Sequence, residues 1–118
     1  MNGPVRPTRP ISWLKPALKA FNDFPEGARE VMVDALSLAA EGSKPGIAKP
    51  MKGLGSGVFE VALPYRGNAF RVVYAVQLGD DLWVVHAFQK KSTQGIKTPQ
   101  REIDTIKERL KRLKEMLP

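Results

Sequence analysis

The chain has 118 residues, 42% of them hydrophobic, and a net charge of +7 from nineteen Lys and Arg against twelve Asp and Glu. This length predicts one domain, residues 1–118, with enough apolar side chains to bury a core. The absence of cysteine excludes disulfides and thiolate metal sites, and a single histidine argues against a histidine-rich metal centre, so we expect no metal and no cofactor. The lack of a transmembrane-length apolar run or a signal peptide predicts a cytoplasmic protein without membrane contact.

The charges are distributed unevenly along the chain. Residues 1–22, 42–59 and 82–101 carry lysines and arginines but no acid, whereas five acids fall within residues 23–41. Such asymmetry favours nucleic acid as a partner, or a protein with an acidic docking surface. Solubility alone is the alternative explanation.

The first third of the chain predicts two helices. We expect residues 1–10 to be flexible. Residues 11–23 predict a short strand or turn that leads into a helix, with Pro16 as its first residue. A second helix is expected from Pro25 to about Glu41, with Asn22 or Asp23 as its cap. Residues 43–57 form a loop rich in Gly, Pro and Lys, and its glycines do not have the spacing of a triphosphate-binding loop.

Three antiparallel strands are predicted next, because polar and apolar residues alternate and the connections are short. The strands are Val58–Leu63, ended by Pro64, then Phe70–Leu78 and Leu82–Gln89. This alternation places Glu60, Arg71 and Lys91 on one face, and Lys90 on the other unless the strand ends or twists before it. It groups His86 with Leu82, Val84 and Phe88 as a hydrogen-bonded core histidine, and sets Trp83 on the opposite side.

The final predicted helix has Thr98 as its cap and Pro99 in its first position. Its apolar stripe is Ile103, Ile106, Leu110, Leu113 and Leu117. The other face is cationic, which fits either ordinary solvation or contact with phosphates.

Cations within apolar strands are the most informative feature of the sequence. Arg71 interrupts an alternating hydrophobic run, and Lys90 and Lys91 end another. A strand accommodates such charges if one face is open, and an open basic face suggests a polyanion as ligand.

The ordered set of motifs resembles the RelE/ParE superfamily of bacterial toxins, in particular the HigB-like branch with phage-derived relatives. The resemblance covers roughly residues 11–113. It rests on the strand arginine followed by Phe-x-Lys-Lys, on Thr98-Pro99 at a helix start, and on the segments 34–42, 48–55, 58–61, 70–74 and 85–92.

The resemblance implies a small α+β toxin with helices packed on one side of a twisted antiparallel sheet and a C-terminal helix. It implies the toxin component of a type II toxin–antitoxin system that cleaves mRNA in the ribosomal A site without a metal. The implied partners are the ribosome, mRNA and a cognate helix-turn-helix antitoxin, with operator DNA bound only through the antitoxin. ParE-like members act on DNA gyrase instead, and a non-catalytic phage or operon regulator is a further alternative.

The chemistry of RNA cleavage suggests roles for particular residues. Arg71 is the first choice as transition-state stabiliser, because arginine stays charged and offers a planar fork of donors to phosphate oxygens. Lys90 and Lys91 would add positive charge beside it, and Glu60 is a candidate general base. The alternative for Arg71 is a structural ion pair with Glu60. Contacts that position the RNA are expected from Lys49, Lys52 and Arg66.

Overall fold

The computed structural model of the chain describes residues 8–91 and 97–118, without the side chain of Lys91. The expected flexibility of residues 1–10 therefore falls mostly outside the described residues. In chain order the elements are β1 (Ile11–Trp13), α1 (Lys15–Asn22), α2 (Glu26–Ala40), β2 (Ala48–Pro50), β3 (Val58–Tyr65), β4 (Asn68–Ala75), β5 (Leu82–Lys91) and α3 (Gln100–Met116).

The strands form one sheet with the order β1-β5-β4-β3-β2. The predicted antiparallel meander of β3, β4 and β5 is confirmed. Two strands of three residues each extend it: β1 pairs with β5 in parallel, and β2 pairs with β3 antiparallel. The turn between β3 and β4 has positive φ at both central residues, Arg66 (51°) and Gly67 (83°). This backbone matches the twist of the two strands that it joins.

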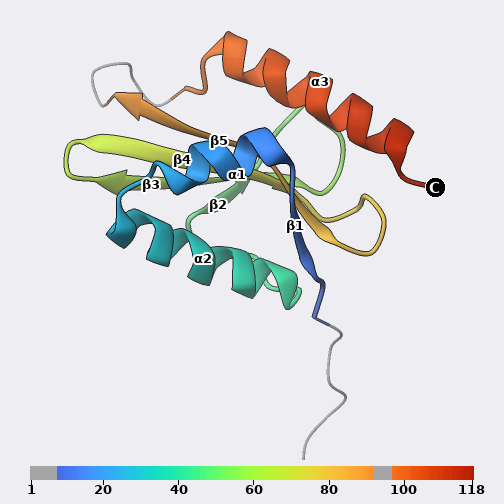
Figure 1. Cartoon of the computed structure of the whole chain (residues 1–118), viewed down its shortest axis with the longest axis horizontal. Helices are drawn as coiled ribbons and strands as arrows, with labels where there is room; N and C mark the ends of the chain where they lie inside the picture. Colours follow the sequence, from blue (N-terminus) through green and yellow to red (C-terminus); the bar gives the residue numbers. More distant parts are fainter. Residues whose placement is uncertain (1–7, 92–96) are drawn as a thin grey trace, which may run out of the picture.

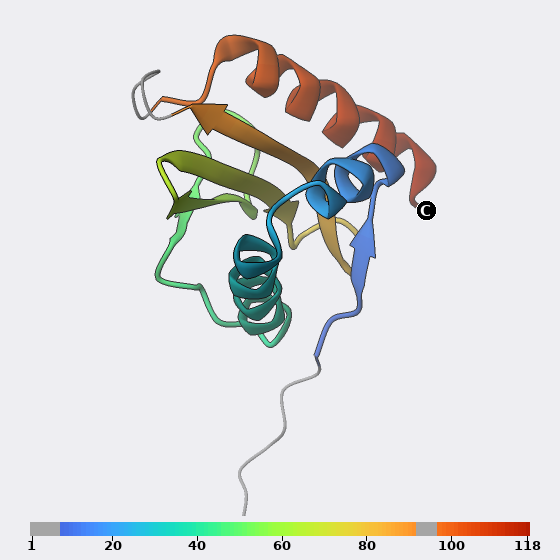
Figure 2. The same ribbon diagram turned by 60° about the vertical axis from the view of Figure 1, so that its left-hand side comes forward.

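The helices lie on both sides of the sheet, so the expectation that they pack on one side is wrong. The predicted α+β class with a C-terminal helix is confirmed. Figure 1 shows α3 above the sheet and α2 below it, and Figure 2 shows the same separation from another direction. Two clusters of buried side chains reflect this arrangement, one between the sheet and α1 and α2, the other between the sheet and α3. The face that was predicted to be open is therefore partly covered by α3.

A series of aromatic rings runs through the core on the α1 and α2 side. Trp13 and Phe21 have ring centroids 4.8 Å apart, and Phe21 and Phe24 are 5.5 Å apart. Phe24 continues the series to Phe70 on β4, at 4.8 Å. Such tilted ring pairs stabilise a core beyond the area that they bury. Trp13 is thus a structural residue of this core.

Several predicted element boundaries are wrong for identifiable reasons. Pro64 lies inside β3 rather than ending it, because β2 pairs only with residues 59–61 and leaves that end of β3 as an edge, where proline is tolerated. β4 ends at Ala75, and β5 runs to Lys91.

The predicted helix caps are also wrong, although Pro16 does lie in the first turn of α1. The cap positions of α2 and α3 are Pro25 and Pro99, and no side chain caps either helix. The hydroxyl of Thr98 bonds to side chains from the sheet instead of to the helix.

Candidate functional site

A β-bulge in β5 determines which side chains face α3. Val73 on β4 pairs with His86, but the next residue, Tyr74, pairs with Val84, so Val85 is an additional residue on β5. The alternation of side chains shifts at this point. As a result Val85 belongs to the α3 cluster, and His86 also bonds to residues of α3.

Because of the bulge, two predictions about β5 are wrong. His86 does not share a face with Leu82 and Val84, which belong to the α1 and α2 core. It is nevertheless buried and hydrogen-bonded, as predicted. Trp83 packs in the α3 cluster, the side that His86 also faces, rather than on the opposite side.

Arg71 and Glu60 form a buried ion pair on the α3 face. The Arg71 Nη1 donates to Glu60 Oε1 at 2.8 Å, and only 8% and 12% of the two side chains are exposed. The same nitrogen donates to the Thr98 hydroxyl at 3.2 Å, and that hydroxyl donates to Glu60 Oε2 at 2.8 Å. The two strand residues and the segment before α3 are thereby joined in one hydrogen-bonded network.

Lys90 lies next to this network, contrary to the expectation from strict alternation. Its side chain is 1% exposed, and its Nζ donates to the carbonyl of Lys97. Burial lowers the pKa of Lys90, the nearby Arg71 lowers it further, and Glu60 opposes both effects. In the register of β4 and β5, Lys91 pairs with Asn68, and Lys90 pairs with Ala69. The side chain of Lys91 lies outside the described residues.

A second polar network joins His86 to α3. Arg109 Nη1 donates to the carbonyl of Val85 at 3.0 Å and to His86 Nδ1 at 2.7 Å. Since a guanidinium can only donate, Nδ1 must accept, and Nε2–H then donates to Glu102 Oε1 at 2.8 Å. His86 is therefore neutral. Burial lowers its pKa, Arg109 adds to that effect, and Glu102 opposes it.

The three residues predicted to position RNA are exposed, but they lie apart. Lys49 pairs with Glu60 across β2 and β3, which places it beside the ion pair. Lys52 follows β2 in a loop that packs on the α3 cluster through its neighbours. Arg66 lies in the β3–β4 turn with its guanidinium 5.3 Å from the centroid of the Tyr65 ring, and Tyr65 belongs to the other core. The structure thus brings Lys49, but not Arg66, to the Arg71 network.

Sequence reasoning missed three participants: Thr98 as a bridge, and Glu102 and Arg109 as partners of His86. Glu102 and Arg109 could have been recognised from the sequence, because they are seven residues apart on α3 and therefore lie on the same helix face as Ile106. Ile106 is buried in the α3 cluster.

The described residues offer neither a metal site nor a membrane-spanning helix. Across residues 8–91 and 97–118, no three His, Asp or Glu side chains gather in a way that could hold a metal ion. Within the same ranges, every helix is too short or too polar to cross a membrane.

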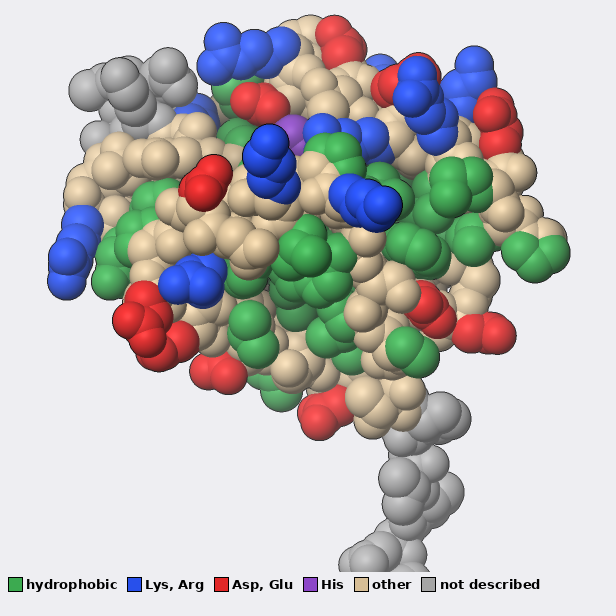
Figure 3. Space-filling model, viewed as in Figure 1, with side chains coloured by type: hydrophobic (Ala, Val, Ile, Leu, Met, Phe, Trp, Pro, Cys, Tyr) green, Lys and Arg blue, Asp and Glu red, His purple; other side chains and the backbone are tan. Residues whose placement is uncertain are grey.

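The charges outside these networks are unevenly distributed. Figure 3 shows Lys and Arg side chains mainly on the upper half of the molecule, interspersed with Asp and Glu along α3, and mainly Asp and Glu over α2 on the lower side. A groove of about 370 Å³ between the loop after β2 and α3 is lined by Lys107, Lys111 and Lys114 together with Gly53, Leu54 and Gly55. The α3 side of the molecule thus combines buried ionic networks with an exposed basic surface.

The chain is similar in fold to three solved structures of bacterial toxins. A double arginine-to-alanine variant of the E. coli toxin RelE in the free state has a TM-score of 0.61 and 18% identity, over 89% of this chain and 97% of that one. The isolated E. coli RelE toxin has a TM-score of 0.56 and 18% identity, over 85% and 97%. The toxin–antitoxin complex RelBE2 from Mycobacterium tuberculosis has a TM-score of 0.50 and 13% identity, over 72% and 93%.

Sequence comparison gives the family. No curated protein matches the chain significantly. Residues 19–111 match the family model described as Phage derived protein Gp49-like (DUF891). That match spans β3, β4, β5 and most of α3, and therefore every residue of the two networks. The chain belongs to the phage-derived Gp49-like family.

Proposed function

We propose that this protein is the toxin of a type II toxin–antitoxin system of the HigB type and acts as a ribosome-dependent, metal-free mRNA endoribonuclease. One observation carries the proposal: Arg71, Glu60 and Lys90 meet on one face of a RelE-like sheet, next to exposed lysines. Positive charge for the phosphate and a carboxylate for proton transfer are what cleavage at a 2′-hydroxyl requires.

Each residue has a distinct part in this mechanism. Glu60 accepts the proton of the 2′-hydroxyl, and the 2′-oxygen then attacks the adjacent phosphorus. The bond from phosphorus to the 5′-oxygen of the next nucleotide breaks, which leaves a 2′,3′-cyclic phosphate, and a water molecule supplies the proton that the departing 5′-oxygen takes up. Arg71 stabilises the extra negative charge that develops on the phosphorane. Lys90 is too deeply buried to be the main contact with RNA, so it contributes positive potential beneath the ion pair.

Substrate positioning falls to the exposed cations. Lys49 lies beside Glu60, and the groove along α3 offers three more lysines. From Glu102 to Lys114 the helix rises ~18 Å, enough to follow several nucleotides of a single strand. Lys52, Arg66 and Lys91 keep the roles predicted for them from the sequence.

The proposed partners are the ribosome, mRNA and a cognate helix-turn-helix antitoxin, with operator DNA bound through the antitoxin. A toxin of this fold has been solved in complex with its antitoxin. Co-expression with a candidate helix-turn-helix antitoxin should suppress growth arrest and yield a co-purifying complex. Growth arrest that persists despite co-expression would argue against that candidate as the antitoxin.

A second function is favoured by the burial of the ion pair. Because Arg71 and Glu60 are both largely buried, the pair can be a purely structural contact. The protein would then act as a gyrase-directed toxin or as a non-catalytic regulator that binds nucleic acid or antitoxin.

The deciding experiment is induced expression in a bacterial host with mapping of transcript 5′ ends. Glu60→Gln and Arg71→Gln remove one charge each and keep much of the side-chain volume, and circular dichroism checks that both variants fold. Arg112→Ala serves as a matched control, because Arg112 is an exposed arginine in a pair with Glu108. We expect new ends at in-frame codon positions with the wild type and the control, reduced by at least about a hundredfold in the two variants.

Each other outcome selects an alternative. Growth arrest without new 5′ ends would support a protein target such as gyrase. New ends that persist in folded Arg71→Gln would refute the catalytic role of Arg71. An absence of both arrest and new ends would favour the regulator.

A further inference from the structure

We propose that a pocket between the C-terminal end of α2 and the opposite face of the sheet binds a carboxylate carried on a ring-sized apolar body. The pocket is built around the hydroxyl of Tyr74, between Lys44 and Arg9. It lies on the other side of the sheet from Arg71, and its argument does not depend on RNA cleavage.

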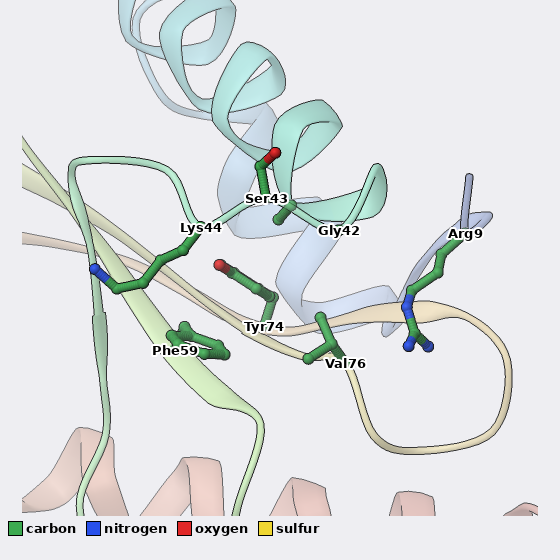
Figure 4. Close-up of a pocket in the computed structure, with 8 residues that line it drawn as sticks. Arg9, Gly42, Ser43, Lys44, Phe59, Tyr74 and Val76 are labelled. Atoms are coloured by element: carbon green, nitrogen blue, oxygen red, sulfur yellow. The ribbon is translucent and has the colours of Figure 1, made fainter. Parts of the chain in front are cut away.

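The pocket has a volume of about 200 Å³. Phe59, Tyr74 and Val76 form its floor, and Gly42, Ser43 and Lys44 form the wall where the chain leaves α2. In Figure 4 Lys44 extends on one side and Arg9 on the other, with the Tyr74 ring between them. The site therefore combines an apolar floor with a positive charge at each end.

Tyr74 is the observation that points to a ligand. Its side chain is 1% exposed, yet its hydroxyl makes no hydrogen bond to any residue in the described part of the chain. Figure 4 shows this hydroxyl directed into the pocket, toward the segment of Ser43 and Lys44. The hydroxyl is therefore accessible from the pocket and has no protein partner among the described residues, so it can donate to a bound acceptor. Burial raises the pKa of Tyr74 to about 12, so the group keeps its proton and remains a donor at neutral pH.

The two cations are not required by α2 itself. Cationic side chains often lie near the last carbonyls of a helix. Here the carbonyls of residues 37–40 already accept from backbone N–H groups, those of Glu41, Ser43, Gly42 and Arg9 respectively. The side chains of Lys44 and Arg9 are thus available to an external anion.

The surroundings favour a single negative charge over a phosphate dianion. The pocket lies at the negative end of the α2 dipole, and Glu41 and Asp80 line an adjoining pocket. A carboxylate needs only the donors that are present: one hydroxyl and one or two cationic groups. The local field opposes a dianion more strongly than a monoanion, and the donors present suffice for a carboxylate.

The remaining volume indicates the size of the ligand body. Phe59 and Tyr74 stack with ring centroids 5.4 Å apart, and Val76 and Ala39 complete an apolar lining. A cavity of about 150 Å³ holds benzene in another protein. Benzoate is therefore a suitable probe.

The test is an NMR titration of the whole protein with benzoate, followed at backbone amides. We expect saturable shifts at residues 42–44 and 76 with a dissociation constant of about 1 mM, reasonable for a ligand of this size. Tyr74→Phe should weaken binding about tenfold, because it removes one hydrogen bond to a charged group. Tyr65→Phe is the matched control and should bind as the wild type does. Benzyl alcohol, which has the ring without the charge, should bind at least tenfold more weakly.

A second arm identifies the source of the carboxylate. The dipeptide N-acetyl-Gly-Phe, with a free carboxyl group, is compared with its amide and with benzoate. Tighter binding of the free peptide than of benzoate indicates a protein C-terminus, and the reverse indicates a small molecule. The proposal is overturned if benzoate causes no shifts at residues 42–44 and 76, if Tyr74→Phe binds with unchanged affinity, or if benzyl alcohol binds as well as benzoate.

Discussion

The two faces of the sheet are stabilised by different means. On the α1 and α2 face, Phe24, Phe70 and their neighbours form an aromatic core. On the α3 face, apolar contacts share the space with Arg71, Glu60, His86 and Lys90, which are all largely buried. A buried charge is tolerated only when partners satisfy it. The first face therefore depends on packing and the second also on correct pairing, and the following variants separate the two contributions.

The largest effect is expected from Phe70→Ala. Phe70 is buried against Phe24 at 4.8 Å and near Tyr65 at 6.2 Å. Loss of the ring leaves a cavity in the aromatic core and should lower the free energy of unfolding by about 3–5 kcal/mol. Urea denaturation measures the change. Leu38→Ala, at an exposed position of α2, is the control and should change it by less than about 0.5 kcal/mol.

The next effect should come from Glu60→Gln. This substitution keeps the shape of the side chain but leaves Arg71 buried without its counter-charge, which should cost about 2–3 kcal/mol. The double variant Glu60→Gln with Arg71→Met removes both charges and should recover more than half of that loss. If the double variant is less stable than Glu60→Gln alone, the pair contributes through packing and not through charge.

A smaller effect should appear as a pH dependence. The folded protein lowers the pKa of His86 below the value of 6.5 for an unfolded chain, so the unfolded state binds more protons between these two values. Stability from His86 is then fully present above pH 6.5 and is lost as the pH falls through the folded pKa. Thermal unfolding between pH 7.5 and 5 should show this decline, and His86→Gln should flatten it. An equally steep decline in the variant would mean that titratable groups other than His86 cause the pH dependence of stability.

The smallest effect should come from Arg112→Ala. Arg112 and Glu108 are 2.9 Å apart, but both are exposed. Such pairs contribute about 0.5 kcal/mol or less, and salt weakens them further. If urea denaturation shows that the free energy of unfolding falls by more than about 1 kcal/mol, the exposed side of α3 makes contacts that stabilise the fold.

The alternation of residues predicted much of the sheet. Phe59, Val61 and Leu63 do pack together on one face, and Glu60 and Arg71 do lie together on the other. The class of fold and the last helix also followed from periodicity and from the resemblance. Strand β1 lies where a short strand or turn was expected before the first helix, whereas β2 was missed because three residues are too few to show a period.

The candidate site was predictable only in part. Arg71 and its pairing with Glu60 could be inferred from two strands of correct register. The position of Lys90 and the surroundings of His86 could not, since they depend on where β5 pairs irregularly with β4. The roles of Thr98, Glu102 and Arg109 depend on how α3 docks, which is a property of the folded chain and not of any local pattern.

The additional residue in β5 has a consequence for comparing this chain with its relatives. A relative without the bulge would have one residue fewer between the positions of Trp83 and His86. An ungapped alignment would then match each side chain on one half of the strand with a side chain that faces the other way. Functional positions in the family are best transferred by counting backward from the Phe88-Gln89-Lys90 segment, on the far side of the bulge, with a one-residue gap allowed at Val85.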